Sequence, residues 1–297
     1  MRFIAITVAL LLTVPAKAVD RQQIATVNVA ATSLFTFLGC VVQGKLQKRV
    51  QTRRDAARCF AAGGAAGIGF YQAKRLVADG DITTGWLVAN LATSVVENTT
   101  AGEHPFSRLG YTFGPFRLRF ATPADRAGES YVDLDLSLVE TGFLARMLID
   151  ADDVDIRDGM LWWETEERLT EDGRAFNGYT WGLYPGVWTR ARESTWNHEA
   201  VHAIQALQLD SVDPPALTLS PCPERTAGPP EASGRSSLVG GVKAPCAGRN
   251  RQAVRIRYIR AGVVNLTDNL FWGQRAYDER WVEIEAFRLV DDRKPPQ

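Results

Sequence analysis

The chain has 297 residues, of which 45% are hydrophobic and 23% are charged. This composition is typical of a globular protein with one large or two small domains, and it excludes a disordered or collagen-like chain. Lys and Arg together number 34, as do Asp and Glu, so the basic excess that nucleic-acid binding requires is missing. We therefore expect no nucleic-acid partner. Only 3 His occur, so two that fall close together are informative.

Residues 1–18 have the features of an export signal. Arg2 gives a positive start, an apolar run extends from Phe3 to Val14, and Ala16 and Ala18 are the small residues that precede a cleavage site. The alternative is an uncleaved membrane anchor, but the apolar run is shorter than the roughly 20 residues that span a bilayer. We therefore expect cleavage after Ala18 and an exported chain that is periplasmic, secreted or attached to the cell envelope.

Export places the four Cys in an oxidising compartment, where disulfides form. Cys222 and Cys246 bracket a segment rich in Pro, Gly and Ser, and they are the first expected pair. Cys40 and Cys59 are the candidates for a second pair.

Residues 19–102 are predicted to form a small helical unit. No charge occurs from Gln22 to Gly44, which is long enough to cross a membrane, but Asn28 and several Thr make it less apolar than a typical span. A buried or membrane-surface helix is the alternative, so residues 22–96 are a candidate for membrane contact. Further helices are expected at Ala56–Asp79, where small residues such as Gly63 and Gly67 recur every four positions, and at Thr84–Val96.

The pattern becomes alternating after about residue 105. Four apolar residues share one face of Val132–Leu138, which predicts a half-buried strand. Weaker signals predict three more strand regions, at Gly110–Phe120, Val154–Glu164 and Gly178–Thr189. A short helix is expected at Thr141–Asp150, a Pro/Gly-rich loop over 211–252, a late strand at Ala253–Ile259 and a last helix at Tyr277–Val290. We predict an α+β fold in which the helical unit precedes a domain over 103–297 with a small antiparallel sheet.

One motif in the sequence is typical of a metal-binding catalytic site. Residues 198–202 read His-Glu-x-x-His within a stretch of good helix formers. Because His198 and His202 are four residues apart, they share one face of a helix and can bind a single zinc ion, while Glu199 can polarise a metal-bound water. The alternative is two ordinary histidines on an amphipathic helix.

A catalytic zinc site needs a third protein ligand. In one group of zinc proteases a third His follows six residues after the second, with a Gly between them, but here those positions are Gln208 and Gln205. The remaining His, His104, is expected in a loop or on the surface. A carboxylate from the last helix is the better source.

Glu285 is the predicted third ligand. It shares a helical stripe with Trp281 and Leu289, which indicates a buried face, and a buried carboxylate needs a partner such as a metal. The alternative partner is a nearby Arg, either Arg275 or Arg288. Glu283 lies on the expected solvent face and is the reserve candidate.

These residues resemble the gluzincin group of zinc metallopeptidases, in which a His-Glu-x-x-His helix is completed by a Glu on a later helix. The resemblance implies a zincin-like domain, zinc held by His198, His202 and Glu285, Glu199 as general base, and a peptide or protein substrate. The chain is also similar to exported bacterial proteins that carry His-Glu-x-x-His-x-x-Gln. It departs from the thermolysin-like pattern at Leu289, where that pattern has an Asp, so no partner for a ligand histidine is identified.

Other residues could support such a site. The Gly178–Thr189 stretch is a candidate for the edge strand that pairs with an extended substrate. Tyr258 and Tyr277 are candidate donors to an oxyanion, although a Tyr is more often an ordinary core or surface residue. Charged residues flank the motif helix, which argues against a membrane-embedded protease. The alternative function is a non-catalytic cell-envelope interaction protein with a structural or vestigial metal site.

Overall fold

The structure is a computed structural model, which describes residues 20–46, 52–124, 132–171, 174–211, 217–219, 254–257 and 281–290. The predicted export signal over 1–18, the Cys222–Cys246 pair, and Tyr258 and Tyr277 all lie outside the described residues. So does most of the predicted Pro/Gly-rich loop.

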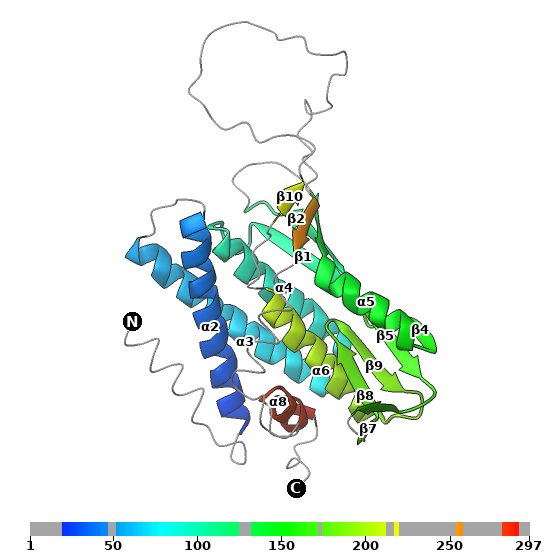
Figure 1. Ribbon diagram of the computed structural model, residues 1–297. Helices are drawn as coiled ribbons and strands as arrows, with labels where there is room; N and C mark the ends of the chain where they lie inside the picture. Colours follow the sequence, from blue (N-terminus) through cyan, green and yellow to red (C-terminus); the bar gives the residue numbers. More distant parts are fainter. Residues whose placement is uncertain are drawn as a thin grey trace, which may run out of the picture.

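The predicted α+β architecture is confirmed (Figure 1). The described helices are α2 (Arg21–Leu46), α3 (Arg53–Ala78), α4 (Ile82–Thr100), α5 (Leu138–Asp150), α6 (Glu193–Asp210) and α8 (Trp281–Val290). Each of the predicted helices is present. The motif residues lie in α6, and the C-terminal carboxylates lie in α8, which packs against α6.

Within the described ranges, the strands form two mixed sheets and a two-stranded hairpin. The five-stranded sheet runs β1 (Arg108–Phe113), β2 (Phe116–Ala121), β3 (Val132–Ser137), β11 (Val254–Arg257) and β10 (Leu217–Leu219). The four-stranded sheet runs β4 (Asp153–Arg157), β5 (Met160–Thr165), β9 (Tyr184–Trp188) and β8 (Gly178–Trp181), and the hairpin pairs β6 (Leu169–Glu171) with β7 (Arg174–Phe176). The pairing is antiparallel as predicted, except that β11 runs parallel to β3 and β9 parallel to β5. Three predicted strand regions are in fact hairpins, one of which turns at Asp158 and Gly159, both with positive φ.

Small residues let α2 and α3 pack very closely, as their spacing predicted. A Cβ atom on Gly63 would lie 2.7 Å from the carbonyl oxygen of Thr32, and one on Gly67 would lie 2.7 Å from that of Asn28. The two helix backbones are therefore in direct contact. This contact brings the polar side chains of α2 against α3, and Asn28 and Thr32 are buried.

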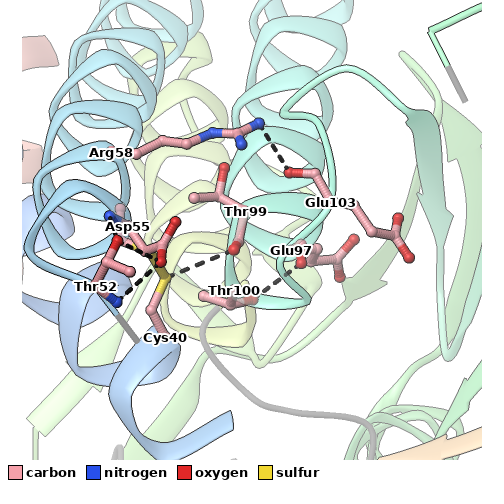
Figure 2. The surroundings of a disulfide bond; sticks show 9 residues. Cys40, Thr52, Asp55, Arg58, Glu97, Thr99, Thr100 and Glu103 are labelled. Atoms are coloured by element: carbon pink, nitrogen blue, oxygen red, sulfur yellow. Dashed lines mark hydrogen bonds between the residues drawn. A yellow bond between two sulfur atoms is a disulfide. The ribbon is translucent and has the colours of Figure 1, made fainter. Parts of the chain in front are cut away.

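A disulfide between Cys40 and Cys59 joins α2 to α3, with the two Cα atoms 6.5 Å apart. It confirms one of the two predicted pairs. In Figure 2, Cys40 Sγ lies 3.6 Å from the carbonyl oxygen of Thr99, and Arg58 donates to the carbonyl oxygen of Glu103 over 3.2 Å. The crosslink thus fixes the place where α2, α3 and the end of α4 meet. A disulfide of this kind is consistent with export.

The helix α2 is long and apolar enough to cross a membrane. Its most apolar 18 residues have a mean hydropathy of 1.7, and 39% of that window is buried inside the protein. A buried core helix and a signal sequence can pass the same test. Membrane contact through residues 22–96 therefore stays a prediction.

One hydrophobic core connects the N-terminal helices with the later elements. Its buried side chains include Phe70 on α3, Trp86 on α4, Trp162 on β5, Ile204 on α6 and Leu289 on α8. The boundary predicted near residue 102 therefore does not separate two hydrophobic cores. As a result, α6 is held by α3 and α4 on one side and by the four-stranded sheet on another.

Strands β2 and β3 of the five-stranded sheet bury their polar face. The alternation over Val132–Leu138 predicted a half-buried strand, but the buried side chains are the intervening ones, including Asp133 and Asp135. Their charges are compensated, because Arg119 contacts Asp133 at 3.2 Å and Asp135 at 3.3 Å. The apolar side chains on the other face remain at least 40% exposed at five positions: Leu109, Phe116, Leu118, Phe120 and Val132.

Polar side chains of α4 bind the outer edge of β1. Asn98 donates to the carbonyl oxygen of Arg108 (2.8 Å), and Ser94 accepts from the N–H of Gly110 (2.8 Å). Asn90 accepts from the N–H of Thr112 (2.8 Å), and Trp86 Nε1 donates to the Thr112 carbonyl oxygen (3.2 Å). Residues spaced by four on the helix thus replace a neighbouring strand.

Candidate metal centre

The helix α6 presents the motif as its sequence predicted. His198 and His202 lie one turn apart, with ring centroids 4.7 Å apart and an interplanar angle of 80°. Their Nε2 atoms are 3.0 Å apart, and each side chain is only slightly exposed. Phe287 of α8 packs against the His198 ring at 4.6 Å between centroids, which helps to fix its orientation. Both imidazoles therefore direct Nε2 toward the same point.

The helix α8 brings Glu283 to this point. Its Oε2 lies 3.3 Å from His198 Nε2, and its Oε1 lies 3.4 Å from His202 Nε2. The ligand atoms of His198, His202 and Glu283 all fall within 4.8 Å of one another. Among the described residues, these three are the group that could hold a metal ion.

Glu285, the ligand predicted from the sequence, is elsewhere. Its carboxylate binds the buried ammonium of Lys74 at 2.9 Å and accepts from Gln205 Nε2 at 2.7 Å. The third position in the group belongs to the reserve candidate, Glu283, and the placement of Glu283 on a solvent face was wrong because it is 4% exposed. The periodicity of α8 predicted one buried face and one exposed face. Because α8 packs against α2, α3 and α6, the carboxylates of both Glu283 and Glu285 are buried.

The charges of the group depend on one another. Burial alone would lower the pKa of His202, but the Glu283 carboxylate, with help from Glu199, raises that pKa to about 9. Burial would likewise raise the pKa of Glu283, whereas the neighbouring His202 and His198 hold it well below its usual value. In the metal-free protein, His202 therefore carries a positive charge that the Glu283 carboxylate stabilises.

Glu199 faces the edge strand β8. Thr180 donates its hydroxyl to Glu199 Oε2 at 2.7 Å, and a Cβ atom on Gly178 would lie 2.6 Å from Glu199 Oε1. Burial raises the pKa of Glu199, although the two His and the Thr180 hydroxyl oppose this change. The glycine leaves room for the carboxylate, and the threonine orients it.

Lys74, Thr180 and Gly178 were missed as site residues by the sequence analysis. Gly178 and Thr180 lie in the stretch that was predicted to be a strand near the site. The sequence did not predict their contact with Glu199. Lys74 had no sequence signal, because it is directly followed by Arg75 and nothing in the local pattern distinguishes the two cations. His104 is exposed on a loop, as predicted.

Comparison with known proteins adds no relative. No protein-family model matches the sequence, and no curated protein and no solved structure is significantly similar to it.

Proposed function

We propose that the protein is an exported zinc-dependent metallopeptidase in which His198, His202 and Glu283 hold the metal and Glu199 is the general base. The observation that carries this proposal is the convergence of the three ligand atoms beside the Glu199 carboxylate. Residues of this type bind zinc in many hydrolases, with one position left for water.

The separations between the candidate ligand atoms are close to those that a zinc ion requires. A tetrahedral ion with ligands at about 2.0 to 2.1 Å requires them to be about 3.3 Å apart. The two Nε2 atoms are 3.0 Å apart, and each lies near a different oxygen of Glu283: Oε2 is 3.3 Å from His198 and Oε1 is 3.4 Å from His202. Gln205 Oε1 lies 2.7 Å from His202 Nδ1, so the proton is held on Nδ1 and Nε2 is left as the metal ligand. The donor set supports zinc once rotation of the Glu283 carboxylate brings one of its oxygens close to both Nε2 atoms.

A bound zinc ion would supply a Lewis acid that polarises a carbonyl group and acidifies a water molecule. Glu199 would accept a proton from the attacking water while the water oxygen bonds to the peptide carbonyl carbon. As the carbon–nitrogen bond breaks, Glu199 would return that proton to the leaving amine. Burial raises the pKa of Glu199, which makes its carboxylate a stronger base.

The edge strand β8 is the proposed place for the substrate backbone. The N–H of Trp188 donates to the carbonyl oxygen of Asn177, so these two residues are a hydrogen-bonded pair. Hydrogen-bonded and non-hydrogen-bonded pairs alternate along antiparallel strands. Gly178 and Thr180 are therefore in non-hydrogen-bonded pairs, and their backbone N–H and C=O groups point away from β9. Pro185, opposite Thr180, has no N–H to donate. Within the described chain, β8 has a strand neighbour on one side only. An extended peptide added there would lie beside Glu199.

A second candidate is the non-catalytic envelope interaction protein, with a structural metal. The exposed apolar face of the five-stranded sheet favours it, because large apolar patches often mark interaction sites. Glu199 discriminates between the two functions, since a structural site has no use for a general base beside an open coordination position.

The test is the zinc content of the mature chain, purified without a His tag, together with cleavage of a peptide library. We expect one zinc per chain in the wild type and in E199Q, and little or none in H202A and E283A. Cleavage should occur in the wild type and be lost in E199Q. A wild type that folds without zinc contradicts the metal site, and equal cleavage by E199Q contradicts the role of the base.

A further inference from the structure

We propose that Gln205, Glu285 and Lys74 are positioning residues of the metal site, and that through them the N-terminal helices α2 and α3 take part in zinc binding. The proposal rests on the proposed zinc site. It concerns how His202 is held, and not which residues touch the metal.

The first link fixes the proton on His202. Gln205 Oε1 lies 2.7 Å from His202 Nδ1, and Gln205 Nε2 donates to Glu285 Oε2 at 2.7 Å. A carboxylate only accepts, so the amide nitrogen must face Glu285 and the amide oxygen must face the imidazole. That oxygen also only accepts, so His202 must carry a proton on Nδ1. This leaves Nε2, the atom beside Glu283, for the metal.

The second link holds Glu285. The Lys74 ammonium lies 2.9 and 3.0 Å from the two carboxylate oxygens of Glu285, and it also contacts Asn28 Oδ1 and Gln208 Oε1, each at 2.8 Å. Its three N–H groups therefore have three different acceptor groups. Lys74 is 1% exposed and Glu285 is 2% exposed, so the pair is held in one arrangement by protein groups and not by solvent.

The third link reaches α2. The amide nitrogen of Asn28 donates both to the carbonyl oxygen of Ile24 (2.9 Å) and to Glu285 Oε1, while its oxygen accepts from Lys74. Gly67 allows this reach, because it places the backbone of Asn28 directly against α3. The close contact between α2 and α3 thus sets the position of a group that bonds to Glu285.

This arrangement answers a chemical need of the proposed site. Histidine ligands of zinc usually donate their second N–H to a carboxylate or carbonyl group, and loss of that partner weakens metal binding about 10- to 100-fold. Here the acceptor is an amide oxygen, and the carboxylate lies one hydrogen bond further away. Buried ion pairs add little stability compared with apolar replacements. We therefore assign to the Lys74–Glu285 pair the role of orienting His202 through Gln205.

The test is the zinc dissociation constant of the full mature chain, measured by competition with a chromophoric chelator. Q205L should weaken zinc binding by about 10- to 100-fold. The matched control is N98L, which removes buried amide hydrogen bonds far from the site and should change zinc affinity less than twofold. The exchange variant Q205E/E285Q keeps an acceptor on His202 Nδ1 and a carboxylate–amide pair but loses the Lys74–Glu285 ion pair, so its zinc affinity should lie between those of Q205L and the wild type.

The outcomes separate the two proposals. A folded wild type without zinc refutes the proposed metal site itself. A wild type that binds zinc with a Q205L variant of equal affinity refutes only the positioning role, as does an exchange variant no better than Q205L. If Q205L does not fold, Q205N decides by the same criterion, since its shorter amide cannot reach both partners.

Discussion

The metal-free protein should lose stability as the pH rises from 6.5 to 9, because His202 is more basic in the folded chain than in the unfolded one. The pKa of His202 is raised from 6.5 to about 9, mainly by the carboxylate of Glu283 acting against burial. A group with a raised pKa contributes stability that is fully present below its unfolded pKa and is lost as the pH passes its folded pKa. The window is therefore 6.5 to 9.

The size of the effect follows from the shift. Each pKa unit corresponds to about 1.4 kcal/mol, so the loss in unfolding free energy across this window is at most about 3 kcal/mol. Glu283 affects the unfolding free energy at acid pH. Its pKa is lowered, so its contribution is present above its usual value near 4.5 and is lost as the pH falls through the lowered one.

Guanidinium unfolding with a chelator present, at half-unit steps from pH 6 to 9, measures this dependence. The matched control is E283Q, which removes the carboxylate that raises the pKa of His202. We expect the wild type to lose up to about 3 kcal/mol more than E283Q over the window. If the two proteins change equally with pH, the charge coupling between His202 and Glu283 is not present.

Three further predictions concern packing, crosslinking and catalysis. Gly67→Ala places a methyl group 2.7 Å from a carbonyl oxygen of α2 and should lower the unfolding free energy by about 1 to 3 kcal/mol, measured by chemical denaturation. Gly142→Ala, with open space around it, should raise the unfolding free energy by up to about 1 kcal/mol. Equal effects of the two substitutions would contradict the close helix contact. Replacing Cys40 and Cys59 together by Ser should lower the unfolding free energy by about 3 kcal/mol, given their separation of 19 residues, and no loss would show that the crosslink does not restrict the unfolded chain. Gly178→Ala should reduce peptide cleavage with zinc content unchanged, because its methyl group would lie 2.6 Å from the carboxylate of the proposed base; an unchanged rate would argue against that contact.

The sequence predicted the elements better than the faces they bury. The motif helix, the α2–α3 contact and the Cys40–Cys59 pair all followed from local spacing, and the structure contains each of them. The polar face of β3 was not foreseen, because its buried carboxylates are paired with Arg119 on β2, and the alternation of β3 by itself favours burial of the apolar face.

The candidate site shows the same limit. His198, Glu199 and His202 are close in the chain, so their geometry is set by one helix. The choice between Glu283 and Glu285 depended on a cation from α3, 211 residues before Glu285 in the sequence. Periodicity of α8 alone could not reveal that partner.

The side-chain ladder between α4 and β1 also limits the length of the sheet edge. Four residues of a helix advance about 6 Å, whereas two residues of a strand advance about 6.8 Å, so the two repeats drift apart by about 0.8 Å at each step. Only a few consecutive hydrogen bonds can tolerate such a drift, and β1 has 6 residues. Within this short span the helix occupies the donors and acceptors that an open strand would offer to another chain. The edge is thus closed to intermolecular pairing by side chains that cannot themselves continue a sheet.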